Sequence, residues 1–197
     1  MGNPSISRRD VLKSLTVGVM AGSVLRVIPA EAAEYAHSMI QSEKTSNGKY
    51  KPKYFPEHQY KTVQALCQAI IPADERSGGA IEAGAPEFID LLTSESADYQ
   101  LALGGGLMWL DSACLDRFGK VFVECTPTDQ SAILNLIAYK KNALTDSSLS
   151  QGIEFFSFLR NLTADGYFTS EIGIKDLGYI GNKYLKDFPG CPPVPEA

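Results

Sequence analysis

Apolar residues recur along this chain at the spacing of an α-helix. The clearest segment carries them at positions i, i+3, i+4 and i+7, as Val63, Leu66, Cys67 and Ile70. Pro72 ends the pattern, because proline cannot continue a helix. A helix with one apolar face must bury that face against another element, so this segment predicts one member of a helical bundle.

The same spacing predicts four further helices. The first follows Pro86, and the second spans about 98–118. The third begins at the Thr126-Pro127 cap, and the fourth spans about 149–164. Three consecutive glycines at 104–106 lie inside the third of these five helices and cost about 1 kcal/mol each relative to alanine, which indicates a kink or a close contact between helices. No pair of segments shows the alternating pattern of a β-hairpin. We therefore expect an all-α fold, a small irregular bundle of about five helices.

The chain changes character after Asp165. The last segment is rich in glycine, ends in a proline-rich stretch and has no helical stripe, so we expect an extended C-terminal arm over residues 165–197. Its aromatic residues are too dispersed to form a core of their own and must be buried against something else. They are Tyr167, Phe168, Tyr179, Tyr184 and Phe188. Two alternatives stay open: the arm packs back over its own bundle, or it forms an interface with another protein.

The N-terminal residues have the order of an export signal. Arg8 and Arg9 form a pair in a charged start, a short apolar run follows, and Ala30-Glu31-Ala32 provides a small-x-small cleavage site. This order predicts a twin-arginine signal peptide over residues 1–32, cleaved after Ala32 and recognised by the twin-arginine translocase. Such a signal serves proteins that fold before export. The alternative is an uncleaved N-terminal helix that anchors the chain.

Residues 33–56 are polar and show no sustained periodicity, so we interpret them as a loosely packed lead-in. Residues 57–197 then form one helical domain that includes the arm. The formal net charge of −5 makes the chain a poor binder of polyanions, which excludes nucleic acid as a partner.

Four cysteines follow the signal: Cys67, Cys114, Cys125 and Cys191. Their wide spacing lacks the clustered ligands of a zinc or iron–sulfur site, so we expect no metal. In an oxidising compartment all four are candidates for disulfides, and three full pairings are possible. Cys191 lies between Pro-Gly and Pro-Pro, a constrained position that suits a disulfide to another cysteine of this chain or to a partner.

The chain offers little for catalysis. His37 and His58 are its two histidines, and no haem-attachment or dinucleotide-binding motif is present. Acidic residues cluster around a glycine-rich loop and could coordinate a cation, although such residues are more often solvated. They are Asp74, Glu75, Glu82 and Glu87. We expect no catalytic, cofactor-binding or metal-binding residue in this chain.

Three blocks of sequence carry a resemblance to a known family. They are AIIPADERSGGAIEAGAPEFIDLL at 69–92, LDRFGKVFVECTPTDQSAIL at 115–134, and the segment 155–193 with GYFTS, LGYIGN and FPGC. In this ordered set the chain resembles the gluconate 2-dehydrogenase subunit 3 family. These proteins are the small third subunits of membrane-associated, FAD-dependent sugar and sugar-acid dehydrogenases.

The resemblance implies that the chain is a non-catalytic partner. A GMC-type large subunit would hold the FAD and oxidise the sugar, and a cytochrome c subunit would carry the haem c that takes the electrons onward. The large subunit of this family lacks an export signal, so the small one would supply it and place the complex in the periplasm at the inner membrane. The alternative is a free-standing periplasmic sugar-binding protein or enzyme that uses the acids of the glycine-rich loop.

Overall fold

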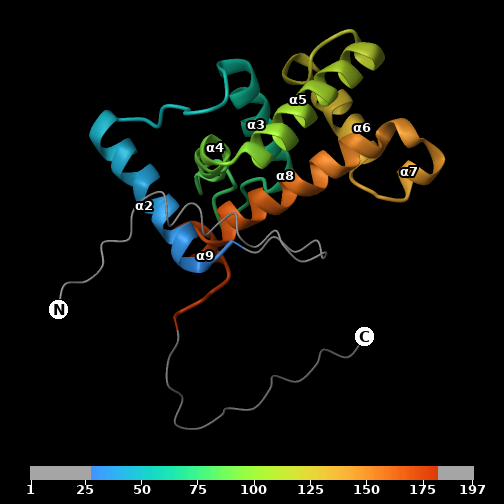
Figure 1. Cartoon of the computed structure of the whole chain (residues 1–197). Helices are drawn as coiled ribbons and strands as arrows, with labels where there is room; N and C mark the ends of the chain where they lie inside the picture. Colours follow the sequence, from blue (N-terminus) through green and yellow to red (C-terminus); the bar gives the residue numbers. More distant parts are fainter. Residues whose placement is uncertain (1–27, 182–197) are drawn as a thin grey trace, which may run out of the picture.

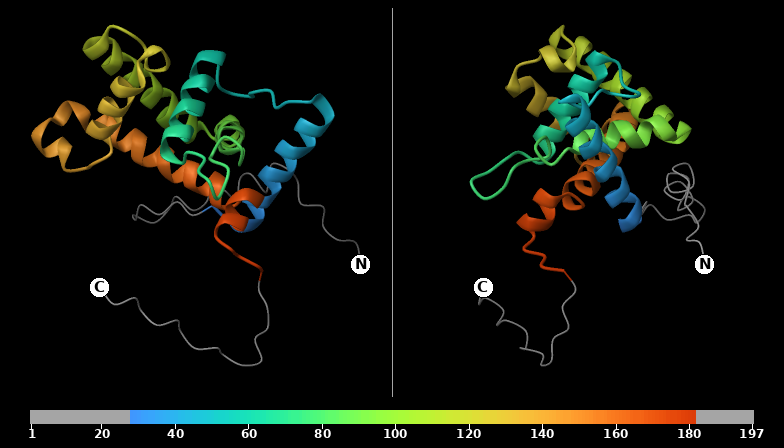
Figure 2. Two further views of the ribbon diagram at one scale, coloured as in Figure 1. Left: turned by 180° about the vertical axis from the view of Figure 1, so that it is seen from behind. Right: turned by 90° about the vertical axis from the view of Figure 1, so that its left-hand side faces the viewer.

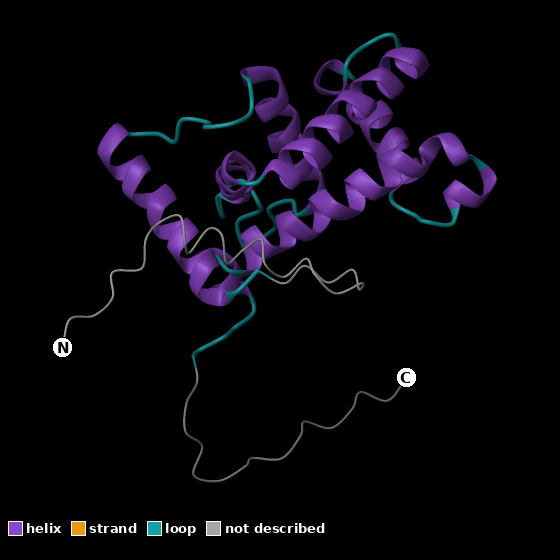
Figure 3. Ribbon diagram, viewed as in Figure 1, coloured by secondary structure: helices purple, strands orange, loops and turns teal. Residues whose placement is uncertain are grey.

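The computed structural model describes residues 28–181, and in this part of the chain the fold is all-α (Figure 1, Figure 3). Eight α-helices and two short 3-10 helices account for its regular structure. The α-helices are α2 (Ala30–Asn47), α3 (Glu57–Ile70), α4 (Ala85–Glu95), α5 (Ala97–Phe118), α6 (Pro127–Ile137), α7 (Asn142–Thr145), α8 (Ser150–Phe168) and α9 (Glu171–Asp176). The 3-10 helices are η2 (Phe122–Glu124) and η3 (Ser147–Leu149).

Helix α8 is the centre of the bundle. It packs along α4 and α5, and α2 and α3 also contact α4. Helices α6 and α7 lie at the end of the molecule opposite α2 (Figure 2). The largest fully buried side chains come from six different elements, which makes one continuous core. They include Phe88, Leu66, Leu107, Phe122, Ile133 and Leu159.

Glycines allow α5 and α8 to approach each other closely. A Cβ atom at Gly106 of α5 would collide with the ring of Phe155 on α8. The relation is reciprocal, because a Cβ at Gly152 of α8 would collide with the indole of Trp109 on α5. Of the two explanations for the glycine run, a close contact between helices is therefore correct for Gly106.

Side-chain caps fix where several helices begin. Ser96 accepts a hydrogen bond from the backbone N–H of Tyr99 at the start of α5. Thr126 does the same for the N–H of Asp129 at the start of α6, at 3.2 Å. Each cap satisfies a backbone donor that has no partner inside the helix, and it sets the residue at which the helix starts.

The five expected helices are all present, as α3, α4, α5, α6 and α8. The prediction of a loosely packed lead-in over residues 33–56 was wrong, because α2 covers much of that range and its inner face is buried. Ala32, Ala36 and Ile40 lie on this face at intervals of four residues. Alanines bury little area individually, but they let α2 lie close to α4.

The prediction of an extended arm from residue 165 was also wrong for its first part. Helix α8 continues to Phe168, and α9 follows after a two-residue turn. Ser170 caps α9 by accepting a hydrogen bond from the N–H of Gly173 at 3.1 Å. A Cβ at Gly173 would collide with the carbonyl of Tyr167, so this turn needs glycine there.

Candidate partner-binding surface

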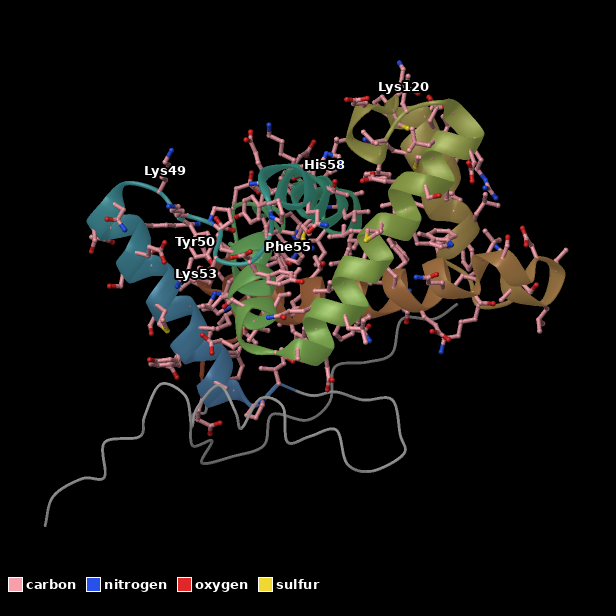
Figure 4. The ribbon with its side chains drawn as sticks, turned by 45° about the horizontal axis from the view of Figure 1, so that its top comes forward. Lys49, Tyr50, Lys53, Phe55, His58 and Lys120 are labelled. Atoms are coloured by element: carbon pink, nitrogen blue, oxygen red, sulfur yellow. The ribbon has the colours of Figure 1, made fainter. Side chains whose placement is uncertain are left out.

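One buried carboxylate fixes the segment between α2 and α3 onto α4. Asp90 on α4 is fully buried and accepts a hydrogen bond from the Tyr50 hydroxyl at 2.8 Å. It also accepts from the backbone N–H groups of Lys53, Tyr54 and Phe55 at 2.6, 3.1 and 2.9 Å. Figure 4 labels Tyr50, Lys53 and Phe55 along this segment. Four donors compensate the cost of burying the charge, so the segment is firmly held.

The N-terminal helix α2 is held by polar contacts as well as by its alanines. His37 stacks on Phe88 of α4 with ring centroids 5.1 Å apart, and its Nε2 lies 2.9 Å from Oγ1 of Thr169. Burial lowers the pKa of His37, which keeps the ring neutral near pH 7. Lys44 forms an ion pair with Glu87 of α4 at 2.6 Å. These contacts tie α2 to α4 and to the turn between α8 and α9.

One exposed apolar surface runs from the end of α8 through α9 to the residues that follow it. Large apolar side chains that are at least one-third exposed gather there, and we call them the C-terminal surface. They are Phe168, Ile174, Leu177, Tyr179 and Ile180. Leu177 is 62% exposed and Ile180 is 72% exposed. Exposed apolar groups in this density are typical of surfaces that another protein covers.

A pocket of about 320 Å³ opens beside this surface. Its wall is formed by the glycine-rich loop on one side and by α8 and α9 on the other. Phe168 belongs both to the pocket wall and to the C-terminal surface, so the two features are continuous. A pocket beside an apolar surface offers a site in which a side chain of a partner can be anchored.

The aromatic residues of the arm have different roles in the structure. Tyr167 is only 3% exposed, and its hydroxyl lies 3.0 Å from Ser77 Oγ and 3.3 Å from Asp176 Oδ2. For Tyr167 the alternative of packing onto its own bundle is therefore correct, and its assignment to an interface was wrong. Phe168 and Tyr179 are exposed. Tyr184 and Phe188 lie outside the described residues.

A second exposed apolar row was not predicted from the sequence. Leu101, Met108 and Leu115 follow one another every seven residues on α5 and are 80, 69 and 49% exposed. Seven residues are close to two helical turns, so the three side chains form a row on the face opposite the buried Leu103 and Leu110. The signal that could have revealed this α5 row is the recurrence of large apolar residues on the outward face of an amphipathic helix.

Three of the four acids around the glycine-rich loop have structural partners, and the fourth, Glu75, is exposed. Asp74 accepts hydrogen bonds from the N–H groups of Arg76 and Ser77, which lower the pKa of its carboxyl. Glu82 accepts from the N–H of Gly79, and Glu87 pairs with Lys44. The loop is thereby closed by its own carboxylates. Within residues 28–181, no three histidine, cysteine or acidic side chains are grouped as a metal site.

The remaining predicted residues are spread over the molecule. Cys67 is buried against Thr163 of α8, with 3.5 Å between Sγ and Oγ1, whereas Cys114 and Cys125 lie at the α5–η2 junction. None of these three cysteines is in a disulfide in the structure. Ala32, the predicted cleavage residue, is buried in the first turn of α2. Arg8, Arg9 and Cys191 lie outside the described residues.

No helix within residues 28–181 has the length and apolar character needed to cross a membrane. No curated protein and no solved structure shows significant similarity to the chain. The sequence does match the family of gluconate 2-dehydrogenase subunit 3 over residues 57–190. This range begins at the first residue of α3 and includes both the α5 row and the C-terminal surface. The chain therefore belongs to the gluconate 2-dehydrogenase subunit 3 family.

Proposed function

We propose that this protein is the non-catalytic small subunit of a periplasmic, membrane-associated dehydrogenase complex that oxidises a sugar or sugar acid. The complex is of the gluconate 2-dehydrogenase or glucoside/lactose 3-dehydrogenase type. A subunit of a dehydrogenase implies partner subunits. FAD is bound by a GMC-type large subunit, and haem c by a cytochrome c subunit. The small subunit stabilises the flavoprotein and supplies the twin-arginine signal for export of both chains.

The observation that carries this proposal is that a chain of this family exposes the apolar C-terminal surface. Leu177, Tyr179 and Ile180 are each more than half exposed, which is costly for apolar side chains in water. Covering them with a partner removes that apolar area from water and stabilises the complex. The structural roles of the loop acids support the same view, because Asp74, Glu82 and Glu87 are already occupied by contacts within the chain.

The free-standing alternative rested on these three acids together with Glu75. A sugar-binding protein needs several polar groups that converge on one cavity and are free to contact hydroxyl groups. Asp74 and Glu82 instead accept backbone hydrogen bonds of their own loop. Titration of the purified chain with gluconate, glucose and lactose in a calorimeter tests this alternative. Heat of binding at millimolar sugar would support it and would contradict a role limited to the complex.

Replacement of the arginine pair tests the proposed export. Arg8→Lys together with Arg9→Lys keeps both charges but removes the paired guanidinium groups that define the signal. The two chains are expressed together, and the flavoprotein is quantified in periplasmic and cytoplasmic fractions by its FAD fluorescence. We expect the double variant to leave the flavoprotein in the cytoplasm.

Arg26→Lys is the matched control, because it makes the same chemical change outside the pair. It should export the flavoprotein as the unaltered chain does. Periplasmic flavoprotein in the presence of the Arg8→Lys/Arg9→Lys variant would overturn the proposal that this subunit carries the signal for both chains.

A further inference from the structure

Two cysteines meet where α5 ends. Cys114 lies in the last part of α5, and Cys125 directly follows η2, with ten residues between them in the sequence. The chain reverses here because Gly119 takes a left-handed conformation with φ of 71°. The N–H of Phe122 then donates to Asp111 Oδ1 of α5 at 3.0 Å, which fixes η2 beside the helix. This reversal brings Cys125 back to Cys114.

The two thiols are neighbours and both are buried, and Cys125 Sγ also lies 3.7 Å from the Lys120 carbonyl, which accepts from it. Cys114 has no exposed surface, and Cys125 is 8% exposed. Burial and the neighbouring Cys125 thiol, which lies within hydrogen-bonding reach, raise the pKa of Cys114 to about 12. Cys67 differs, because its neighbour is the Thr163 hydroxyl. Among the described cysteines, Cys114 and Cys125 are thus the two whose side chains lie next to each other.

We infer that Cys114 and Cys125 form an intrachain disulfide that fixes η2 to the end of α5, while Cys67 remains a thiol. The inference rests on the proposed export, since disulfides persist in the oxidising periplasm and are rare in the cytosol. Only one of the three possible full pairings joins Cys114 to Cys125, and the inference keeps this bond but not the second bond of that pairing, between Cys67 and Cys191.

The bond forms by exchange with an external disulfide, of a protein or of glutathione. Cys125, the less deeply buried of the two, loses its proton, and its thiolate attacks the oxidant, forming a mixed disulfide and releasing one thiol. Cys114 then loses its proton and attacks the sulfur of Cys125, which releases the second thiol. Two cysteines have then lost two electrons and two protons in total, and the oxidant has gained them.

The disulfide is not needed for folding. Hydrogen bonds from Phe122 N–H to Asp111, and from Gln130 Nε2 to the Phe122 carbonyl at 2.9 Å, already hold η2 in place. A chain that folds in the reducing cytosol before export can therefore acquire the bond afterwards. The cross-link restrains the unfolded chain and so raises the stability of the folded chain once it has formed.

Thiol mapping of the full-length chain tests the inference. The purified, reduced protein is incubated with oxidised glutathione, denatured with N-ethylmaleimide present, digested and analysed by mass spectrometry without reduction. We expect a cross-linked peptide pair that contains Cys114 and Cys125, lighter by two hydrogens than the separate peptides, and an alkylated Cys67. Alkylation of both Cys114 and Cys125, or a cross-link from either to Cys67 or Cys191, would overturn the inference.

Single variants provide the matched controls. Cys114→Ser and Cys125→Ser should each abolish the cross-link, and Cys67→Ser should retain it. Oxidation should raise the melting temperature of the unaltered chain and of Cys67→Ser but not that of Cys125→Ser. If a serine variant does not fold, the oxidised and reduced forms of the unaltered chain still give the comparison, and equal melting temperatures would contradict the stabilising role.

The same mapping on protein from cell fractions separates this inference from the proposed function. Periplasmic protein with both thiols free would overturn the disulfide and leave the function standing. Protein confined to the cytoplasm, with a disulfide that forms in glutathione, would support the pairing and contradict the proposed export.

Discussion

At the scale of single residues, Asp90 is the side chain on which the N-terminal half most depends. Replacing it with asparagine removes the charge and leaves one oxygen to accept from four donors, while the new amide N–H₂ faces other N–H groups. We expect Asp90→Asn to lower the free energy of unfolding by about 3 kcal/mol, measured by urea denaturation.

Asp116→Asn is the control for this prediction, because it makes the same change at an exposed position of α5. Its effect should stay within about 0.5 kcal/mol. Equal urea midpoints for the two variants would contradict the central role of Asp90. Its importance was not predicted from the sequence, although the arrangement Phe88-Ile89-Asp90-Leu91-Leu92 places an acid among residues that are all buried.

Asp165 makes stability depend on pH. Burial raises the pKa of its carboxyl to about 6 in the folded chain, whereas an unfolded chain has a value of about 4. The folded state therefore holds the proton more tightly, and its stability from this group is lost as the pH rises from about 4 to about 6. Asp165→Asn should remove that loss, so the variant should gain stability relative to the unaltered chain as the pH rises through this range.

The measurement is urea denaturation of both proteins at several pH values between 4 and 7. Asp74 and Asp146 have lowered pKa values and act in the opposite direction, so the difference between the two proteins, rather than either curve alone, reports on Asp165. If the difference in the free energy of unfolding between the two proteins does not change with pH, the raised pKa of Asp165 is contradicted.

At the scale of secondary-structure elements, the contact between α5 and α8 can be tested by two adjacent glycines. A methyl group at Gly106 would overlap Phe155, whereas the nearest atom to a methyl group at Gly105 is Gln151 Nε2 at 3.8 Å. We expect Gly106→Ala to destabilise the fold by about 1–3 kcal/mol in thermal or urea unfolding. Gly105→Ala should be neutral or stabilising by up to about 1 kcal/mol, because alanine favours a helix.

Both variants replace glycine with alanine in α5, so they differ only in how close the new methyl group lies to α8. Equal effects on stability would mean that the glycine run does not serve helix packing. The sequence indicated a close contact or a kink at this run, but it could not identify which glycine faces α8, because that depends on how the two helices are rotated toward each other.

Helix α2 makes the predicted cleavage site inaccessible in the folded chain. Ala32 and Ala33 are at most 2% exposed, and both donate their N–H groups to the Pro29 carbonyl. Cleavage between them would place a charged amino group on Ala33. This is unfavourable because the charge would be buried and because it would lie at the positive end of the helix dipole. Because twin-arginine substrates fold before export, we expect the exported chain to retain Pro29 and the first turn of α2.

Mass spectrometry of the N-terminal peptide from periplasmic protein provides the measurement. A chain that begins at Ala33 would contradict this prediction. Ala32→Leu offers a further comparison, since it blocks a small-x-small cleavage site. If the bond after residue 32 is not used, the variant should begin at the same residue as the unaltered chain, and its mass should differ only by the three CH₂ groups that leucine adds.

The elements that the sequence predicted and those that it missed differ in how they bury area. The five expected helices carry stripes of leucine, isoleucine and phenylalanine, whose periodicity is visible without a structure. Helix α2 buries alanines, and α9 has six residues, too few for a stripe. The C-terminal surface was partly predicted because aromatic residues stood out there. The α5 row was not predicted, because α5 already has one buried apolar face and only the orientation of the helix shows that the row faces outward.

At the scale of the whole molecule, two exposed apolar surfaces are available to a partner, and variants can separate them. Leu177→Ser with Ile180→Ser removes two exposed side chains from the C-terminal surface and should change stability by no more than about 0.5 kcal/mol. We expect its affinity for the flavoprotein to fall at least about tenfold, because apolar anchors dominate such interfaces. Leu144→Ser on α7, where the leucine is 90% exposed at the opposite end, should bind normally.

The α5 row provides the competing outcome. If Met108→Ser with Leu115→Ser loses the flavoprotein in co-purification while the C-terminal variant retains it, the partner binds along α5 and our assignment of the surface is wrong. Loss in both variants would mean that one large subunit covers both surfaces. Leu115 lies one residue after Cys114, so the disulfide would then stabilise the helix end that the flavoprotein contacts, and reduced protein should bind it more weakly than oxidised protein.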